Sequence, residues 1–306
     1  MEHETAGDPI TGLKWTHATT AKIADELRGV GLHVSPSTVA RLLKQMGFSL
    51  RVNHKKLSRV CKVSPPNRDA QFGKIAALRD DFAARGLPVI SVDTKKKELI
   101  GCFKNPGTAW SRETVAVKDH DFPSEALGKA VPYGIYDLQA NLGTIFVGTS
   151  RETPEFAVDS IEKWWLDEGR VRYPGAKKLA VLADCGGANG PDNRAWKCAL
   201  FERFVQRHHI TIVAAHYPPG ASKWNPIEHR LFCEISKNWA GRPLDAWETM
   251  LNYIRTTATR TGLAVKAHLI DRLYERVKIS DAQIRALPIA RPSDLPQWNY
   301  TLAPCA

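Results

Sequence analysis

The segment Lys178-Leu-Ala-Val-Leu-Ala-Asp184 runs through five consecutive apolar residues into a carboxylate. A short apolar run of this kind is typical of a central strand that is buried on both faces. Leu87-Pro-Val-Ile-Ser-Val-Asp93, earlier in the chain, has the same form. The two segments therefore predict two buried strands, each with an aspartate at its carboxyl end.

Further strands and helices are predicted around these two segments. Val131–Asp137 and Leu142–Gly148 have strand composition and are joined by a hairpin turn at Leu138–Asn141, and Ile210–His216 is a fifth strand. Between positions 98 and 130 no clear period is present, which indicates an insertion. Apolar residues recur at three- and four-residue steps, as in helices, in four segments: 69–85, 153–168, 193–208 and 225–238.

The order of these elements from position 87 is β, β, β, α, β, α, β, α. It is the order of the ribonuclease H-like fold, a mixed α/β sheet of three antiparallel and two parallel strands flanked by helices. In that arrangement the first and fourth strands are neighbours, so Asp93 and Asp184 are expected to meet at one edge of the sheet. Ligands of such sheets gather at the carboxyl ends of the strands.

A third carboxylate is predicted to join the two aspartates. Glu228 stands in the first turn of the last helix, and Leu231, Phe232 and Ile235 follow on one helical face. If that face packs on the sheet, Glu228 points toward the aspartates. Each acidic residue alone is more often a cap or a solvated charge, so the prediction depends on all three coming together.

Three carboxylates in a small volume repel one another unless cations lie between them, and hard divalent ions prefer oxygen ligands. We therefore expect Asp93, Asp184 and Glu228 to be both catalytic and metal-binding. The expected cofactor is a pair of Mg²⁺ ions, for which Mn²⁺ can substitute. Two ions about 3.5–4 Å apart can activate water or a DNA 3′-hydroxyl and stabilise the leaving oxygen of a phosphodiester.

The first 68 residues predict a small helical module. Positions 20–28 form one helix that ends at Gly29 and Gly31, and Ser35-Pro36 opens a second that ends at Gly47. Two short helices with a tight glycine-containing joint form a helix-turn-helix, whose second helix would present Arg41 and Lys44 to DNA. The alternative is a plain pair of helices that contacts no DNA. We expect Val39, Leu42 and Leu43 to be buried in either case.

The distribution of charge favours DNA contact. The formal net charge is +11, and positions 27 to 68 contain nine Lys and Arg but no Asp or Glu. Such a segment suits a phosphate backbone, because its cations release the counterions of DNA. We therefore divide the chain into a DNA-binding module with a basic linker at 1–68 and a catalytic domain at 69–306. The residues predicted to contact DNA are Arg41, Lys44, Arg51, Lys55, Lys56, Arg59 and Lys223.

Several classes of protein are disfavoured. No apolar run approaches the ~18 residues of a membrane span, and the start of the chain is acidic and polar rather than a secretory leader, so we expect a cytoplasmic protein with no membrane partner. The six cysteines include no C-x-x-C pair, which argues against a zinc knuckle or a disulfide framework.

Several motifs closely resemble the ISAzo13-type insertion-sequence transposases. They extend over most of the chain: Ser91-Val-Asp-Thr-Lys-Lys-Lys-Glu98, Phe103-Lys-Asn-Pro-Gly107, Asp119-His-Asp-Phe122, Pro132-Tyr-Gly-Ile-Tyr-Asp137, Ala183-Asp-Cys-Gly-Gly-Ala-Asn-Gly190, His216-Tyr-Pro-Pro-Gly-Ala-Ser-Lys-Trp-Asn-Pro-Ile-Glu-His-Arg-Leu-Phe232 and Trp298-Asn-Tyr-Thr301.

The resemblance implies a magnesium-dependent DDE transposase with a ribonuclease H-like domain, in which Asp93, Asp184 and Glu228 match the catalytic positions. The expected partners are double-stranded DNA, both element ends and target, and further copies of the chain assembled on that DNA. The expected location is the bacterial cytoplasm, at the nucleoid when the protein is bound to DNA.

Two departures from the family pattern leave other functions open. Cys185 stands where the family is expected to have glycine, and the resemblance implies that the chain begins inside the family's N-terminal DNA-binding region. One alternative is a truncated, inactive copy that binds DNA as a repressor. Another is a metal-dependent nuclease. Strand transfer separates a transposase from a nuclease, and binding without cleavage indicates a repressor.

Other residues near the carboxylates have two possible roles each. Lys95, Lys96 and Lys97 follow the first aspartate and either contact the DNA backbone or form a solvated edge. The remaining candidates either steer phosphate and water or serve as turn, cap, core and surface residues: Asn189, Lys223, Trp224, Asn225 and His229.

Overall fold

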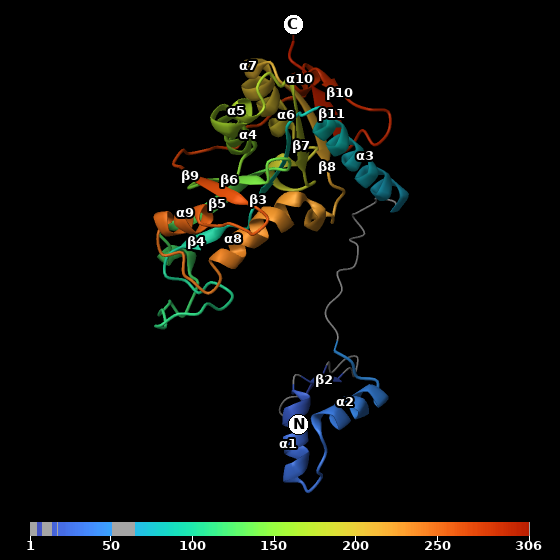
Figure 1. Cartoon of the computed structure of the whole chain (residues 1–306), viewed down its shortest axis with the longest axis vertical. Helices are drawn as coiled ribbons and strands as arrows, with labels where there is room; N and C mark the ends of the chain where they lie inside the picture. The colour runs from blue at the N-terminus through green and yellow to red at the C-terminus, as the bar shows by residue number, and fades with distance from the viewer. Residues whose placement is uncertain (1–4, 8–13, 17, 51–64, 306) are drawn as a thin grey trace. The chain divides into compact units, whose positions relative to one another are not determined.

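The computed structural model describes residues 5–7, 14–16, 18–50 and 65–305 (Figure 1). The chain divides into two compact units, Met1–Ser58 and Arg59–Ala306. The division falls before the boundary at 68 expected from the sequence. Within the described residues, no helix is long and apolar enough to cross a membrane.

The first unit contains the two predicted helices, α1 (Thr20–Gly29) and α2 (Pro36–Gln45). Buried Ile23 and Ala24 of α1 pack with buried Val39 of α2. A short antiparallel pair of strands, β1 (5–7) and β2 (14–16), was not predicted. The two helices therefore share a small apolar core.

Two details of this unit differ from the prediction. Leu42 is 40% exposed, because in the described part of this unit α2 packs on α1 through the face that carries Val39 and Leu43. Residues 30–35 separate the helices, which is longer than the three- or four-residue turn of a helix-turn-helix. The helices are confirmed, but the tight joint is not.

The second unit is built on a mixed sheet with the strand order β10-β11-β8-β7-β3-β5-β6-β9, and β4 pairs with β5. Its five central strands are those predicted, in the predicted order, with β3, β5 and β6 antiparallel and β3, β7 and β8 parallel. Their bounds are β3 (Val89–Thr94), β5 (Gly128–Asp137), β6 (Leu142–Gly148), β7 (Lys178–Ala183) and β8 (Thr211–His216). This order is that of the ribonuclease H-like fold.

Four more strands extend the sheet beyond the five expected: β4 (Glu98–Ile100), β9 (Ala264–Ile270), β10 (Ile289–Ala290) and β11 (Asn299–Leu302). Three of them are only two to four residues long, too short for a periodic signal. Strand β9 is the outermost strand beside β6, at the opposite end of the strand order from β10, and its apolar residues alternate with Lys266 and His268. The insertion between β4 and β5 contains one short turn of helix, η2 (Pro123–Glu125).

Helices cover both faces of the sheet (Figure 1). One face carries α4 (Pro154–Trp164), which continues as η3 (Trp165–Gly169) and α5 (Arg170–Arg172), and the helix formed by α6 (Arg194–Ala199), η5 (Leu200–Val205) and α7 (Gln206–His208). The other face carries α3 (Pro65–Ala84), η7 (Glu228–Phe232) with α8 (Cys233–Asn238), and α9 (Trp247–Arg255). A short α10 (Asp281–Arg285) lies near the end of the chain.

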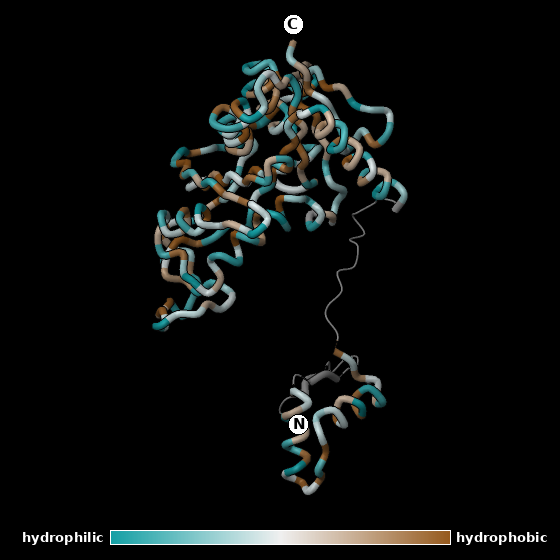
Figure 2. Tube along the Cα trace, viewed as in Figure 1, coloured by the Kyte–Doolittle hydropathy of each residue, from teal (hydrophilic) through white to brown (hydrophobic). Residues whose placement is uncertain are grey.

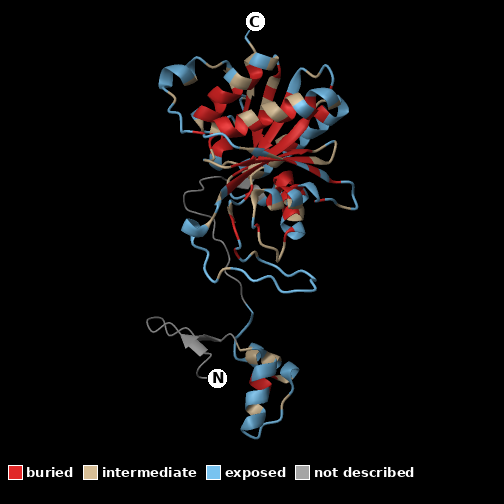
Figure 3. Ribbon diagram, turned by 90° about the vertical axis from the view of Figure 1, so that its left-hand side faces the viewer, coloured by how far each residue is buried: buried red, intermediate tan, exposed pale blue. Residues whose placement is uncertain are grey.

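Burial follows these layers. Buried residues gather in the central strands and on the inner faces of their helices, while exposed residues lie on the outside (Figure 3). In the second unit, hydrophobic residues (brown in Figure 2) are most frequent in the interior of the trace, and hydrophilic residues (teal) are most frequent on its outside. The predicted helices over 153–168, 193–208 and 225–238 each include a π-helical segment, η3, η5 or η7, which apolar periodicity did not reveal. The buried central strands position the polar groups at their carboxyl ends.

Candidate active site

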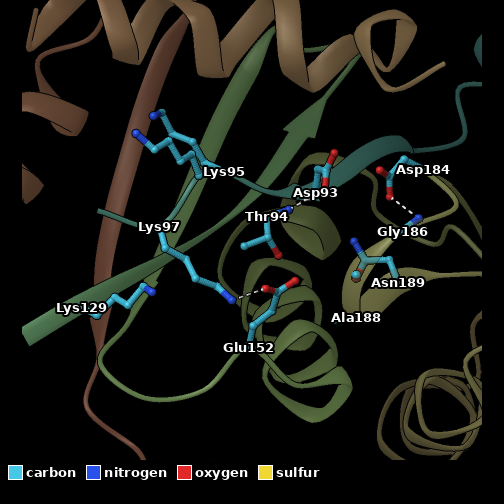
Figure 4. A pocket seen from close by; sticks show the side chains of 12 residues that line it. Asp93, Thr94, Lys95, Lys97, Lys129, Glu152, Asp184, Gly186, Ala188 and Asn189 are labelled. Atoms are coloured by element: carbon cyan, nitrogen blue, oxygen red, sulfur yellow. Dashed lines mark hydrogen bonds and ion pairs between the residues drawn. The ribbon is translucent and has the colours of Figure 1, made fainter. Parts of the chain in front are cut away.

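The two predicted aspartates lie side by side. Asp93 is the penultimate residue of β3, and Asp184 directly follows β7. In the parallel pairing Ser91 stands opposite Leu182, so two residues further along Asp93 reaches the level of Asp184. Neighbouring strands are about 4.8 Å apart. Both side chains line one cavity of about 390 Å³ (Figure 4).

A buried polar contact attaches the helix of Glu228 to the same strand. The Ser91 hydroxyl donates to the side-chain oxygen of Asn225, and it accepts a hydrogen bond from the backbone N–H of Ile227 at 3.1 Å. The Asn225 amide also donates to the carbonyl of Val92 at 3.4 Å. Asn225 is thus a buried structural residue that attaches the start of the helix to β3 just before Asp93.

Glu228 lies on the expected side of the sheet. It is half-buried and begins the π-helical segment η7, while Leu231, Phe232 and Ile235 are buried as predicted. Glu228 does not line the cavity of the aspartates but a second one of about 440 Å³, to which Lys95 and Lys96 also contribute. The three carboxylates therefore face two cavities that share lining residues.

The carboxylates influence one another electrostatically. Burial raises the pKa of Asp93 to about 8, with further contributions from the charges of Asp184, Glu228 and Glu152. The pKa of Asp184 is raised by burial and by Glu152, and that of Glu228 is raised by burial and by Asp184. The site thus holds more negative charge than its surroundings neutralise.

The chemistry of these donors suits a hard divalent cation. All the donors are carboxylate oxygens, the ligands that Mg²⁺ and Mn²⁺ prefer, and a cation would offset both the burial and the mutual repulsion that raise the pKa values of these groups. Among the described residues, no three acidic, His or Cys side chains stand close enough to hold an ion in their present rotamers. Asp93, Asp184 and Glu228 would therefore have to rotate their side chains to share one.

Four lysines border the carboxylates. Lys95 is buried, pairs with Glu98 at 3.2 Å and lies 4.5 Å from the ring centre of Trp239, so the solvated-edge alternative is wrong for it. Its pKa is lowered by burial. Lys96 and Lys97 are exposed, and Lys129 joins them in lining the cavity of the aspartates. The two exposed lysines can reach a phosphate.

Buried hydrogen bonds hold the loop that follows Asp184 in place. The buried Asn189 accepts a hydrogen bond from the Tyr133 hydroxyl at 3.2 Å, and its backbone carbonyl lies 2.9 Å from Nε2 of buried His216. Burial lowers the pKa of His216 to about 4, so this imidazole is neutral at pH 7. Asn189 is therefore held by contacts within the protein core.

Cys185, the departure from the family pattern, fits this loop. Its thiol donates to the carbonyl of Tyr217 at 3.0 Å, and the next residue, Gly186, donates its N–H to Asp184 Oδ1 at 3.0 Å. The side chain at position 185 thus contacts the chain after β8. The described cysteines form no disulfide.

The predicted DNA contacts are placed as follows. Arg41 and Lys44 are exposed on α2, and Lys223 is exposed with its Nζ 4.1 Å from the ring centre of Trp224. Trp224 also receives the guanidinium of Arg68 at 5.0 Å, so it packs between cations at the surface, and His229 is exposed. The remaining predicted contacts lie outside the described residues: Arg51, Lys55, Lys56 and Arg59.

One acidic residue in the cavity was not predicted from the sequence. Glu152 lines the same cavity as Asp93 and Asp184, and it forms an ion pair of 2.8 Å with Lys97 (Figure 4). Glu152 lies between β6 and α4, in a segment without periodicity. The only sequence signal was its place just after a predicted strand of the sheet.

The raised pKa of Asp93 predicts a pH effect on stability. Between its ordinary value of 3.8 and about 8, the unfolded chain has lost a proton that the folded chain keeps, so the free energy of unfolding falls as pH rises. Asp93→Asn removes this loss. The free energy of unfolding of this variant, relative to wild type, should rise from pH 5 to pH 8 by at most about 1.4 kcal/mol per pH unit. The measurement is the difference in melting temperature between the two proteins in metal-free buffer.

The control for this measurement is Asp81→Asn, because Asp81 forms an exposed pair with Arg85 at 3.3 Å. Its difference from wild type should stay constant over the same pH range. An Asp93→Asn difference that also stayed constant would mean that Asp93 ionises normally.

The sequence matches the family described as "Rhodopirellula transposase DDE domain" over residues 1–304. A search of curated proteins found no match. Similar solved structures include the Mos1 transposase paired-end complex with left transposon end (14% identity, 78% of this chain and 65% of that chain, TM-score 0.44). Others are the Mos1 strand transfer complex (14%, 78% and 64%, 0.44) and the Mos1 mariner paired end complex with Mn (13%, 78% and 65%, 0.42). The chain thus covers slightly less than two thirds of each of these Mos1 chains.

Proposed function

Because this chain belongs to the transposase family described as the Rhodopirellula transposase DDE domain, we propose that it cuts DNA at the ends of its own insertion sequence and joins them to target DNA. The observation that carries the proposal is the meeting of Asp93 and Asp184 at adjacent strand ends. Glu228 completes the proposed catalytic set, since its helix is attached to β3 beside Asp93.

We propose that Asp93, Asp184 and Glu228 hold divalent cations, Mg²⁺ or Mn²⁺, and that two ions bind. Two such ions would activate the attacking water or 3′-hydroxyl and stabilise the leaving oxygen. The protein's own groups do the rest. The Ser91–Asn225 contact orients the helix of Glu228, and the exposed ammonium groups of Lys96 and Lys97 attract the phosphodiester backbone.

Double-stranded DNA is the proposed partner, both as element ends and as target. The exposed cations of α2, Arg41 and Lys44, would contact one part of the duplex. Lys223 would contact another part, because it stands exposed in η6 (Ser222–Trp224), just before the Glu228 helix. An insertion sequence has two ends that must be handled together, so we further propose that at least two copies assemble on the DNA.

The experiment that tests this function uses the purified full chain and a linear DNA carrying its gene with both flanks, incubated with Mg²⁺ and a second plasmid as target. A transposase releases the element at defined ends and joins these ends to the plasmid. Cleavage without joining would indicate a nuclease, and binding without cleavage would indicate a repressor. Either of these results would overturn the proposal.

Arg41 gives a prediction about sequence recognition. It is exposed on α2, and an arginine on a helix can donate two hydrogen bonds to guanine in the major groove. If α2 is the reading helix, Arg41→Ala should lower discrimination at one base position by about 1–3 kcal/mol. The measurement is competition binding of the full chain over a library of duplexes with single base changes.

The control for Arg41 is Arg28→Ala, because Arg28 lies on α1 and is already paired with Asp25 at 3.0 Å. It should leave base preference unchanged. An equal loss of affinity for all duplexes in Arg41→Ala would reduce Arg41 to a phosphate contact.

A further inference from the structure

The topology brings a fourth carboxylate to the edge of the sheet where the aspartates lie. Strands β3 and β6 run in the same direction, because each is antiparallel to β5. Near their carboxyl ends Thr94 pairs with Tyr133 and Gly148 pairs with Val131, so both strands end at one edge. Glu152 follows shortly after β6 and therefore comes to this edge.

The position of Glu152 is fixed by the helix that follows it. Thr153 caps α4 by accepting a hydrogen bond from the N–H of Phe156 at 3.2 Å, and Thr153 itself is buried. Helix α4 packs on the opposite face of the sheet from the helix that carries Glu228. The two aspartates are thus approached by Glu228 from one face and by Glu152 from the other.

The side chain of Glu152 faces the aspartates' cavity. It lines this cavity together with Asp93 and Asp184, and Figure 4 shows the three carboxylates around the same space. Its Oε1 also lies close to the loop after Asp184, since a Cβ added at Gly187 would be 3.0 Å from that oxygen. Gly187 also has a φ of +63°. Glycine is therefore favoured there for two reasons, the positive φ and the closeness of the Glu152 oxygen.

Glu152 forms an ion pair with Lys97 in this structure. Its Oε2 lies 2.8 Å from Nζ of Lys97, whose side chain is 38% exposed. The Glu152 side chain is 18% exposed, so the ammonium group is the partner in contact with solvent, and a lysine side chain has a flexible stem. A divalent cation bound in the cavity can therefore displace the ammonium group without a large cost.

From this geometry we propose that Glu152 is an additional metal-binding residue of the catalytic site, and that Lys97 occupies its carboxylate until a divalent cation enters the cavity. The proposal rests on the function proposed above. Cation binding would turn Glu152 toward Asp93 and Asp184 and release Lys97, which is then free to contact a DNA phosphate.

The test is calorimetric titration of the full, metal-free chain with Mn²⁺ in the absence of DNA. Glu152→Gln should weaken binding by about 10- to 100-fold, as the loss of metal-site groups does elsewhere. Glu152→Asp keeps the charge but withdraws it by one methylene group, so it should also weaken binding. The control is Glu125→Gln, which breaks a similar pair with Lys118 at 2.6 Å and should bind Mn²⁺ like wild type.

Lys97 provides the second arm of the test. Lys97→Ala should strengthen Mn²⁺ binding, because the competing ammonium group is gone, and this gain should disappear in the double variant Lys97→Ala/Glu152→Gln. A gain that persisted in the double variant would overturn the displacement of Lys97 from Glu152.

The remaining outcomes separate this inference from the proposed function. Wild-type Mn²⁺ affinity in Glu152→Gln or in Glu152→Asp, beside a large loss in Asp184→Asn, would overturn the role of Glu152 and leave the proposed site intact. Wild-type affinity in Asp184→Asn as well would overturn the proposed metal site itself.

Discussion

Replacing Asp184 by Asn is expected to lower the rate of DNA cleavage and of strand joining by roughly 10³-fold or more, a loss typical of removing a group that stabilises the transition state. The replacement keeps the shape of the side chain but removes the charge that a cation needs. Glu228→Gln should have an effect of similar size if both residues belong to one site. The measurement is the rate of product formation from end-bearing DNA in Mg²⁺.

Folding and DNA binding should survive both substitutions. Burial and nearby carboxylates raise the pKa of Asp184 and of Glu228, so removing a charge relieves repulsion in the metal-free protein. Their melting temperatures without metal should therefore equal or slightly exceed that of wild type. Mg²⁺-dependent cleavage retained by both purified variants would contradict the assigned roles.

Replacing Gly134 by Ala should have the second-largest effect, although Gly134 bears no functional group. It pairs with Asp93 across β3 and β5, and an added Cβ would lie 2.5 Å from the ring of Phe232 and 2.8 Å from Ile227. These two residues lie on either side of Glu228 in the sequence, so their side chains have to shift, and we expect the helix to shift with them. We expect a loss of about 1–3 kcal/mol in stability from overpacking.

The cleavage rate should fall as well in Gly134→Ala. A displacement of about 1 Å at a catalytic group can cost about 100-fold in rate. The matched control is Gly73→Ala on α3, where an added Cβ meets nothing within 4 Å. It should be stabilised by about 0.5–1 kcal/mol and keep its cleavage rate. Wild-type cleavage in Gly134→Ala would mean that the distance from Glu228 to β3 is unimportant.

The central fold was predictable because its strands carry a strong and simple signal. The runs before Asp93 and Asp184 are almost wholly apolar, as strands buried on both faces require, and the order of elements then makes them neighbours. The side of the sheet on which Glu228 lies could be predicted from the helical spacing of Leu231, Phe232 and Ile235, all of which are buried. The elements that carry the three carboxylates could thus be predicted from sequence, while their shared catalytic role stays a prediction.

Features that depend on tertiary packing were not predictable. The short strands β4, β10 and β11 exist because partner strands pair with them, and the π-helical segments leave no mark on the apolar periodicity of their helices. Lys95 looked like a surface lysine, but Glu98 and Trp239 enclose it. Glu152 lies in a segment without periodicity, so only the common edge of β3 and β6 reveals it.

The proposed catalytic activity requires Asp93, Asp184 and Glu228 to share a divalent-cation site. The most direct measurement is the anomalous scattering of Mn²⁺ in crystals of the full chain. We expect a manganese peak coordinated by carboxylate oxygens of Asp93 and Asp184, with Glu228 contributing to the same site. Manganese bound elsewhere on the chain, with these three carboxylates turned away from one another, would contradict it.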